Sequence, residues 1–115
     1  MVQSAVLVAI SIPIFSAQLE KTRDATTLAN IRSAYAEASA LMLSEPDSTS
    51  ATAGNATKTA ANVVQVTGVN LPCTGCGNLD VTVLPFTVTA PSAANKNATI
   101  TFTFATDNSV SATIS

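Results

Sequence analysis

The chain has 115 residues, of which only 10% are charged, a formal net charge of −2 and no His. This length predicts one globular domain with one modest core. With so few Lys and Arg residues, a phosphate-binding basic surface is not expected, so the composition argues against a nucleic-acid partner. Without His, the commonest general base and metal ligand are both absent. We therefore expect a protein that is not an enzyme, with no catalytic residues, no metal and no cofactor.

The segment from Ala5 to Ala17, AVLVAISIPIFSA, is apolar and carries no charge. It is shorter than the roughly 20 residues that a membrane-spanning helix needs. It fits a buried core helix, a signal-peptide core that lacks the charged region and cleavage site, or the tail of a longer hydrophobic helix beginning upstream of Met1. Helical periodicity continues beyond it without a stop signal, which favours the third interpretation.

One helix is expected from near residue 3 to near residue 44, within an N-terminal region 1–45. Its later part is amphipathic, because apolar residues recur every three or four positions. Pro13 removes a helical hydrogen bond, so a kink or local unwinding is expected between Val8 and Ile12. Pro46 restricts the preceding residue, which predicts a helix end at Ser44 or Glu45. The stripe expected to face the core consists of Leu28, Ile31, Tyr35, Ala38 and Met42, widened by Ala34 and Leu41.

Residues 46–62 are rich in Ser, Thr, Ala and Asn, and we expect a surface loop there with at most one short helical turn. Residues 63–115 predict an antiparallel sheet with strands at 63–69, 79–89, 98–105 and 109–114, because Thr and apolar residues alternate in this region. Thr106, Asp107 and Asn108 predict a tight turn between the last two strands. The apolar stripe of the helix is the expected cover for the sheet, which gives an α+β fold.

Cys73 and Cys76 form a CTGC motif, which is compatible with several kinds of chemistry. A zinc site needs two further ligands, and the chain offers no other Cys and no His. A thioredoxin-like centre requires the motif at the start of a helix, whereas the surrounding Pro and Gly residues indicate a turn. Free thiols remain an alternative. The spacing and the turn context favour a structural disulfide in an oxidising compartment.

Two Asn-Ala-Thr sequences, beginning at Asn55 and Asn97, match the acceptor pattern for N-glycosylation, although such short patterns recur by chance. Asp47, Asp80 and Asp107 are separated in sequence, which indicates turn and cap residues and gives no argument for an acid–base pair or a calcium loop.

The run from Ile12 to Ala40, IPIFSAQLEKTRDATTLANIRSAYAEASA, resembles the amino-terminal helix of type IV pilins, particularly those of Gram-positive bacteria. Ile12, Pro13 and Phe15 match the proline-containing step of that family, and the charged cluster LEKTRD and the amphipathic stripe follow it. The resemblance implies a pilin-like fold, with a long N-terminal helix packed on a small antiparallel sheet. The leader peptide, first mature residue and acidic residue of the family have no counterpart here, so about nine mature residues are expected upstream of Met1.

The resemblance further implies a structural subunit of an extracellular, cell-surface filament that serves adhesion, motility or DNA uptake. The expected partners are other copies of the chain in a helical homopolymer, the inner or cytoplasmic membrane before assembly, and the pilus assembly machinery. The assembly surface implied by the resemblance comprises Ala5, Val6, Leu7, Val8, Ile10, Ile12, Pro13, Ile14 and Phe15.

Two other functions stay open on the sequence. One is a pseudopilin of a type II secretion or competence apparatus. The other is a small redox protein that uses Cys73 and Cys76.

Overall fold

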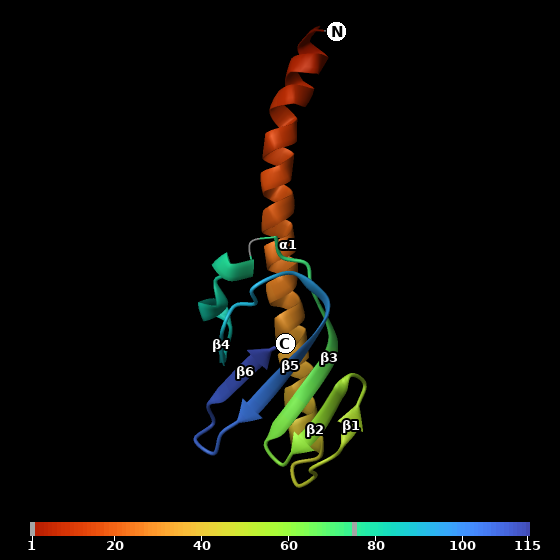
Figure 1. Cartoon of the computed structure of the whole chain (residues 1–115), viewed down its shortest axis with the longest axis vertical. Coiled ribbons are helices and arrows are strands. Elements are labelled where there is room, and N and C mark those ends of the chain that lie inside the picture. The colour runs from red at the N-terminus through yellow and green to blue at the C-terminus, as the bar shows by residue number, and fades with distance from the viewer. Residues whose placement is uncertain (1, 75) are drawn as a thin grey trace.

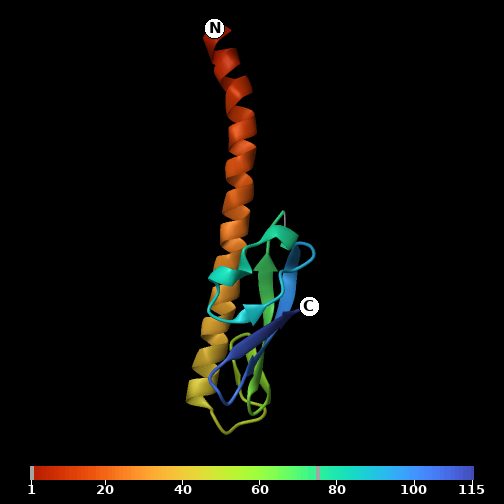
Figure 2. The same ribbon diagram turned by 90° about the vertical axis from the view of Figure 1, so that its left-hand side faces the viewer.

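The computed structural model describes the backbone of residues 2–74 and 76–115, and the side chains from residue 21 onward within those ranges. The fold is α+β, with a long helix packed on a six-stranded, mostly antiparallel sheet (Figures 1 and 2). Two short 3₁₀ helices lie at Cys76–Asn78 and Val81–Val83. The main elements are α1 (Val2–Ser44), β1 (Thr52–Ala53), β2 (Ala56–Ala60), β3 (Val63–Leu71), β4 (Thr87–Val88), β5 (Asn95–Phe104) and β6 (Val110–Ile114).

Helix α1 ends at Ser44, one of the two positions predicted from Pro46. The amide of Glu45 still donates to the carbonyl of Leu41 at 2.9 Å, and Pro46 then prevents a further helical turn. The helical backbone is continuous through Pro13, so the expected disturbance there is not a loss of helical structure. A bend at this position stays a prediction.

The sheet has the strand order β1-β2-β3-β5-β6-β4. Its centre is the antiparallel pair β3 and β5, in which Val64 lies opposite Phe102 and Val66 lies opposite Ile100. All four of these side chains are buried, whereas Thr101 and Thr103, the neighbours of Phe102 in β5, are only partly covered. This alternation gives the sheet one apolar face. The parallel pairing of β4 with β6 is the exception to the antiparallel order.

The predicted stripe of α1 lies against this apolar face. Its members have different degrees of burial: Ile31, Ala34, Ala38 and Leu41 are buried, and Leu28, Tyr35 and Met42 are partly buried against the same cluster. Alanine has a small side chain, so Ala34 and Ala38 let the helix backbone come near the sheet. Helix and sheet therefore share one hydrophobic core.

Tyr35 is the centre of an aromatic cluster within that core. Its ring centroid lies 4.9 Å from that of Phe86, 5.8 Å from Phe102 and 6.4 Å from Phe104. Phe86 and Phe102 also meet edge to face at 5.3 Å. Tilted and edge-to-face pairs of this kind each add about 0.5–1.5 kcal/mol beyond the burial of their area. Tyr35 thus joins α1 to β5 and to the segment before β4.

Two segments differ from the sequence-based expectation. Residues 46–62, expected to be a loop, contain β1 and β2, and β2 extends the sheet beside β3. The buried positions of β2 are Ala56 and Lys58, so its inward face is not conspicuously apolar in sequence. The expected strand at 79–89 is wrong for most of its length, because only Thr87 and Val88 pair with β6.

The 79–89 segment turns away from the sheet for a local reason. The Asp80 carboxylate accepts hydrogen bonds from the amide and hydroxyl of Thr82, which caps the 3₁₀ helix Val81–Val83. Pro85 then lacks the amide that a strand ladder requires. Local capping and proline together prevent a long strand here, despite the alternating apolar residues.

Lys58 is buried on β2, with only 1% of its surface exposed. Its ammonium nitrogen donates to the carbonyl oxygens of Glu45 at 2.7 Å and Pro46 at 3.2 Å. Its own amide donates to the carbonyl of Ala51 at 2.8 Å. A helix C-terminus leaves carbonyls without intrahelical partners and favours positive charge. Lys58 therefore fastens the C-terminal end of α1 to the sheet.

The β5–β6 turn falls at the predicted residues. Asn108 has φ = 70°, a left-handed conformation that Asn tolerates well. The Asp107 carboxylate accepts hydrogen bonds from the hydroxyl of Ser109 at 2.6 Å and from its amide at 3.0 Å. These bonds, the hydroxyl bond first, lower the pKa of Asp107 below its ordinary value of 3.8.

Replacement of Lys58 by Met should lower the free energy of unfolding by about 1–3 kcal/mol, because the helix-end carbonyls lose a charged donor while the aliphatic volume is kept. Urea unfolding checks this, with Lys96→Met at an exposed position as the matched control. A Lys58→Met protein as stable as the parent would show that desolvation of the buried ammonium cancels its hydrogen bonds.

The Asp107 turn should stabilise the fold only while Asp107 is ionised. Because its pKa is lowered in the folded state, the contribution is present above the unfolded pKa and is lost as the pH falls through the folded pKa. Asp107→Asn should therefore differ from the parent more at pH 6 than at pH 2 in urea unfolding. In a Ser109→Ala background the pH dependence of this difference should shrink; an unchanged pH dependence would contradict the assignment to Ser109.

Candidate functional site

The first candidate is the N-terminal part of α1, where the sequence places the assembly residues. We call residues 2–20 the stem and the part of the chain from residue 21 onward the head. The stem projects beyond the sheet in both views (Figures 1 and 2), and the whole molecule measures 68 × 25 × 20 Å. The side chains of the predicted assembly residues, Ala5, Val6, Leu7, Val8, Ile10, Ile12, Pro13, Ile14 and Phe15, lie outside the described residues.

Within the residues that the structure describes, no helix combines the length and the apolar character needed to cross a bilayer.

Cys73 and Cys76 form a disulfide, with their Cα atoms 5.2 Å apart. Both are almost fully buried and make a small second cluster with Leu79. Leu28 of α1 packs against this cluster as well as against the main core. This apolar cluster packs the chain segment after β3 on the helix, and the burial of the disulfide limits the access of an attacking thiolate.

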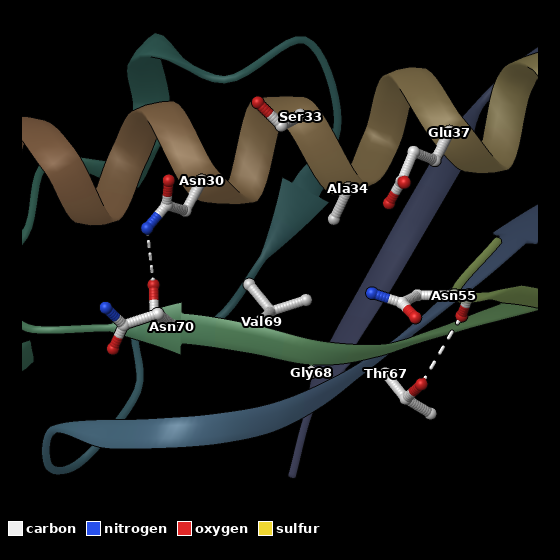
Figure 3. A pocket seen from close by; sticks show the side chains of 9 residues that line it. All are labelled: Asn30, Ser33, Ala34, Glu37, Asn55, Thr67, Gly68, Val69 and Asn70. Carbon is white, nitrogen blue, oxygen red and sulfur yellow. Dashed lines mark hydrogen bonds between the residues drawn. The ribbon is translucent and has the colours of Figure 1, made fainter.

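A polar groove lies between α1 and β3, with a volume of about 230 Å³ (Figure 3). Asn30 of α1 donates to the carbonyl of Asn70 at 2.7 Å, and the Thr67 amide donates to the carbonyl of Asn55 at 3.0 Å. The residues that line the groove are Asn30, Ser33, Ala34, Glu37, Asn55, Thr67, Gly68, Val69 and Asn70.

Gly68 shapes the sheet side of this groove. Its φ of +68° is a conformation that favours glycine, and the β3–β5 register is irregular between Val66 and Val69. A Cβ atom at Gly68 would lie 3.5 Å from the side-chain nitrogen Nδ2 of Asn55 and 3.7 Å from the side-chain oxygen Oδ1 of Asn97. The two Asn-Ala-Thr sequences therefore begin beside each other, a proximity that their separation in sequence does not indicate.

The chemistry available in the groove is hydrogen bonding. Glu37 is the one ionisable side chain among its lining residues, so the groove has no acid–base pair and no activated nucleophile. Across the part of the chain that the structure describes, His, Cys, Asp and Glu also form no group of three that could hold a metal ion.

A second pocket, of about 590 Å³, lies where the head meets the stem. Its lining includes the cationic side chains of Arg23 and Lys96, and both residues are exposed. The remaining lining residues are Asn70, Leu71, Pro72, Ala94 and Asn95. The sequence did not point to this pocket, because its two charges are distant in the chain and come together only when α1 packs on the sheet and β3 pairs with β5.

Comparisons with known proteins identify no relative: no family model, no curated protein and no solved structure matches this chain.

Proposed function

We propose that the chain is a structural subunit of a type IV pilus-like extracellular filament, which polymerises through its hydrophobic N-terminal helix. The observation that carries the proposal is the division of α1 into two parts. The later part covers the apolar face of the sheet, and the stem projects beyond it (Figures 1 and 2). This shape agrees with the pilin-like architecture that the resemblance over Ile12 to Ala40 implies.

The sequence of the stem supplies a physical reason for polymerisation. Residues 5–17 carry no charge, and burial of each large apolar side chain contributes roughly 1.5–3 kcal/mol. An uncharged helix of this kind is stable in a membrane and equally stable against neighbouring helices, because both surroundings are apolar. In this proposal the subunit waits in the inner or cytoplasmic membrane, and the assembly machinery then transfers it to a cell-surface homopolymer.

The head would then face outward in the filament. Its surface displays hydroxyl and amide groups, together with the polar groove of Figure 3, and has few charges. Adhesion, motility or DNA uptake are the roles that such a filament would serve. A pseudopilin of a secretion or competence apparatus is the related alternative, and it shares the same assembly helix.

Placement of a charge in the stem tests the proposal. Val8→Asp should reduce filament formation at least tenfold in electron micrographs and pelleting assays, because a carboxylate would be buried between helices. Val83→Asp is the matched control, since Val83 lies in the head and is 50% exposed.

Circular dichroism should show the same folded head in both variants. Parent protein that forms no ordered filaments, or Val8→Asp protein that assembles like the parent, would overturn the proposal.

The buried Cys73–Cys76 disulfide is expected to serve structure and not catalysis. Its ring is short, so Cys73→Ala/Cys76→Ala should lower the free energy of unfolding by about 2 kcal/mol or less. The parent should show no disulfide reductase or isomerase activity. Thiol-exchange activity that disappears in Cys73→Ser would instead favour the redox function.

A further inference from the structure

The head has two ends along the axis of the helix. The end beside the stem is marked by the pairing of Leu71 with Asn95, where β3 ends and β5 begins. The opposite end is marked by the C-terminus of α1 and by the contact of the Phe104 amide with the Asn62 carbonyl. The pocket of Arg23 and Lys96 lies at the first end, and we call it the basic pocket.

The basic pocket brings two positive charges together in a chain that has few Lys and Arg residues. It contains two of the five Lys and Arg residues, and none of its lining residues carries a carboxylate. Its remaining groups are the amides of Asn70 and Asn95 and the apolar surfaces of Leu71, Pro72 and Ala94. A pocket with two cations and hydrogen-bonding amides is suited to a peptide segment that carries carboxylates.

The opposite end presents such a segment. Glu45 and Asp47 flank Pro46, and both carboxylate residues are exposed. We call residues 45–47 the acidic segment. Lys58 holds its backbone from within, through the carbonyls of Glu45 and Pro46. The proline and this anchor restrict the acidic segment before any contact, which lowers the entropy lost on binding.

The basic pocket and the acidic segment of one chain cannot meet. Arg23 and Ser44 lie on the same rigid helix, and its rise of 1.5 Å per residue separates them by about 32 Å. At physiological ionic strength, charges are screened beyond about 8 Å. Any group that binds the basic pocket or the acidic segment must therefore belong to another molecule.

We infer that the acidic segment of one copy docks in the basic pocket of a second copy, with Glu45 and Asp47 beside Arg23 and Lys96. The contact joins different surfaces of two identical chains, so each copy can bind a further copy, and an open filament results when the rotation between copies does not close a ring. This inference rests on the proposed filament and specifies how neighbouring heads register in it, displaced along the helix axis by about 32 Å.

Charge reversal tests the contact in the full chain. Arg23→Glu/Lys96→Glu should reduce filament yield at least tenfold, and so should Glu45→Lys/Asp47→Lys, because each places like charges together. The four changes combined in one chain should restore the yield to within about threefold of the parent. Arg32→Glu, on the same helix and also exposed, is the matched control and should assemble normally.

Cross-linking separates this inference from the proposed function. A mixture of Lys96→Cys and Asp47→Cys chains should give an intermolecular disulfide between positions 96 and 47 under mild oxidation, and 1 M salt present during the oxidation should lower the yield of this disulfide by screening the charged contact. Asp107→Cys in place of Asp47→Cys is the control and should cross-link at least tenfold less. Filaments without the 96–47 cross-link, or without rescue by the fourfold variant, would overturn the inference. The cross-link without filaments would support the contact and overturn the filament proposal.

Discussion

The fold depends on the packing of one helical stripe against one apolar face of the sheet. Ile31 and Ala38 are fully buried there, opposite Val64, Ile100 and Phe102. A sheet of this size cannot stay folded with such a face in water, because large apolar side chains contribute roughly 1.5–3 kcal/mol each when they are covered. Within the described residues, α1 supplies that cover, and its direction across the sheet fixes where the stem leaves the head.

Polar interactions fix the ends of this arrangement. At the far end, the buried ammonium of Lys58 donates to the carbonyls of Glu45 and Pro46, just after α1, and toward the stem the side-chain amide of Asn30 donates to the carbonyl of Asn70. The hydrophobic stripe alone would let the helix slide or rotate by small amounts, since apolar contacts are not directional. Directional bonds at both ends remove that freedom, so the groove and the basic pocket have definite shapes.

The packing of helix on sheet that stabilises the fold also positions the charged residues used in the proposed assembly. The scarcity of charge makes the few exposed cations and carboxylates conspicuous, and the helix keeps Arg23 and the acidic segment at opposite ends of the head. In the proposed filament, apolar burial of the stem would supply most of the association energy. The charge pairs would set register and orientation, because they act at short range and favour one docking arrangement.

The sequence by itself predicted the α+β class, the helix end at Ser44, the core stripe and the turn at Asp107, because periodicity, proline and turn residues act locally. It also favoured the disulfide between the two cysteines. Strand β2 was missed because its inward residues are Ala56 and Lys58, whose burial depends on partners far away in the chain. The long strand predicted at 79–89 fails because Asp80 caps a 3₁₀ helix and Pro85 lacks an amide. Only the tertiary structure could bring Asn55 beside Asn97 and Arg23 into one pocket with Lys96, since strand register and the packing of the helix on the sheet decide which distant residues become neighbours.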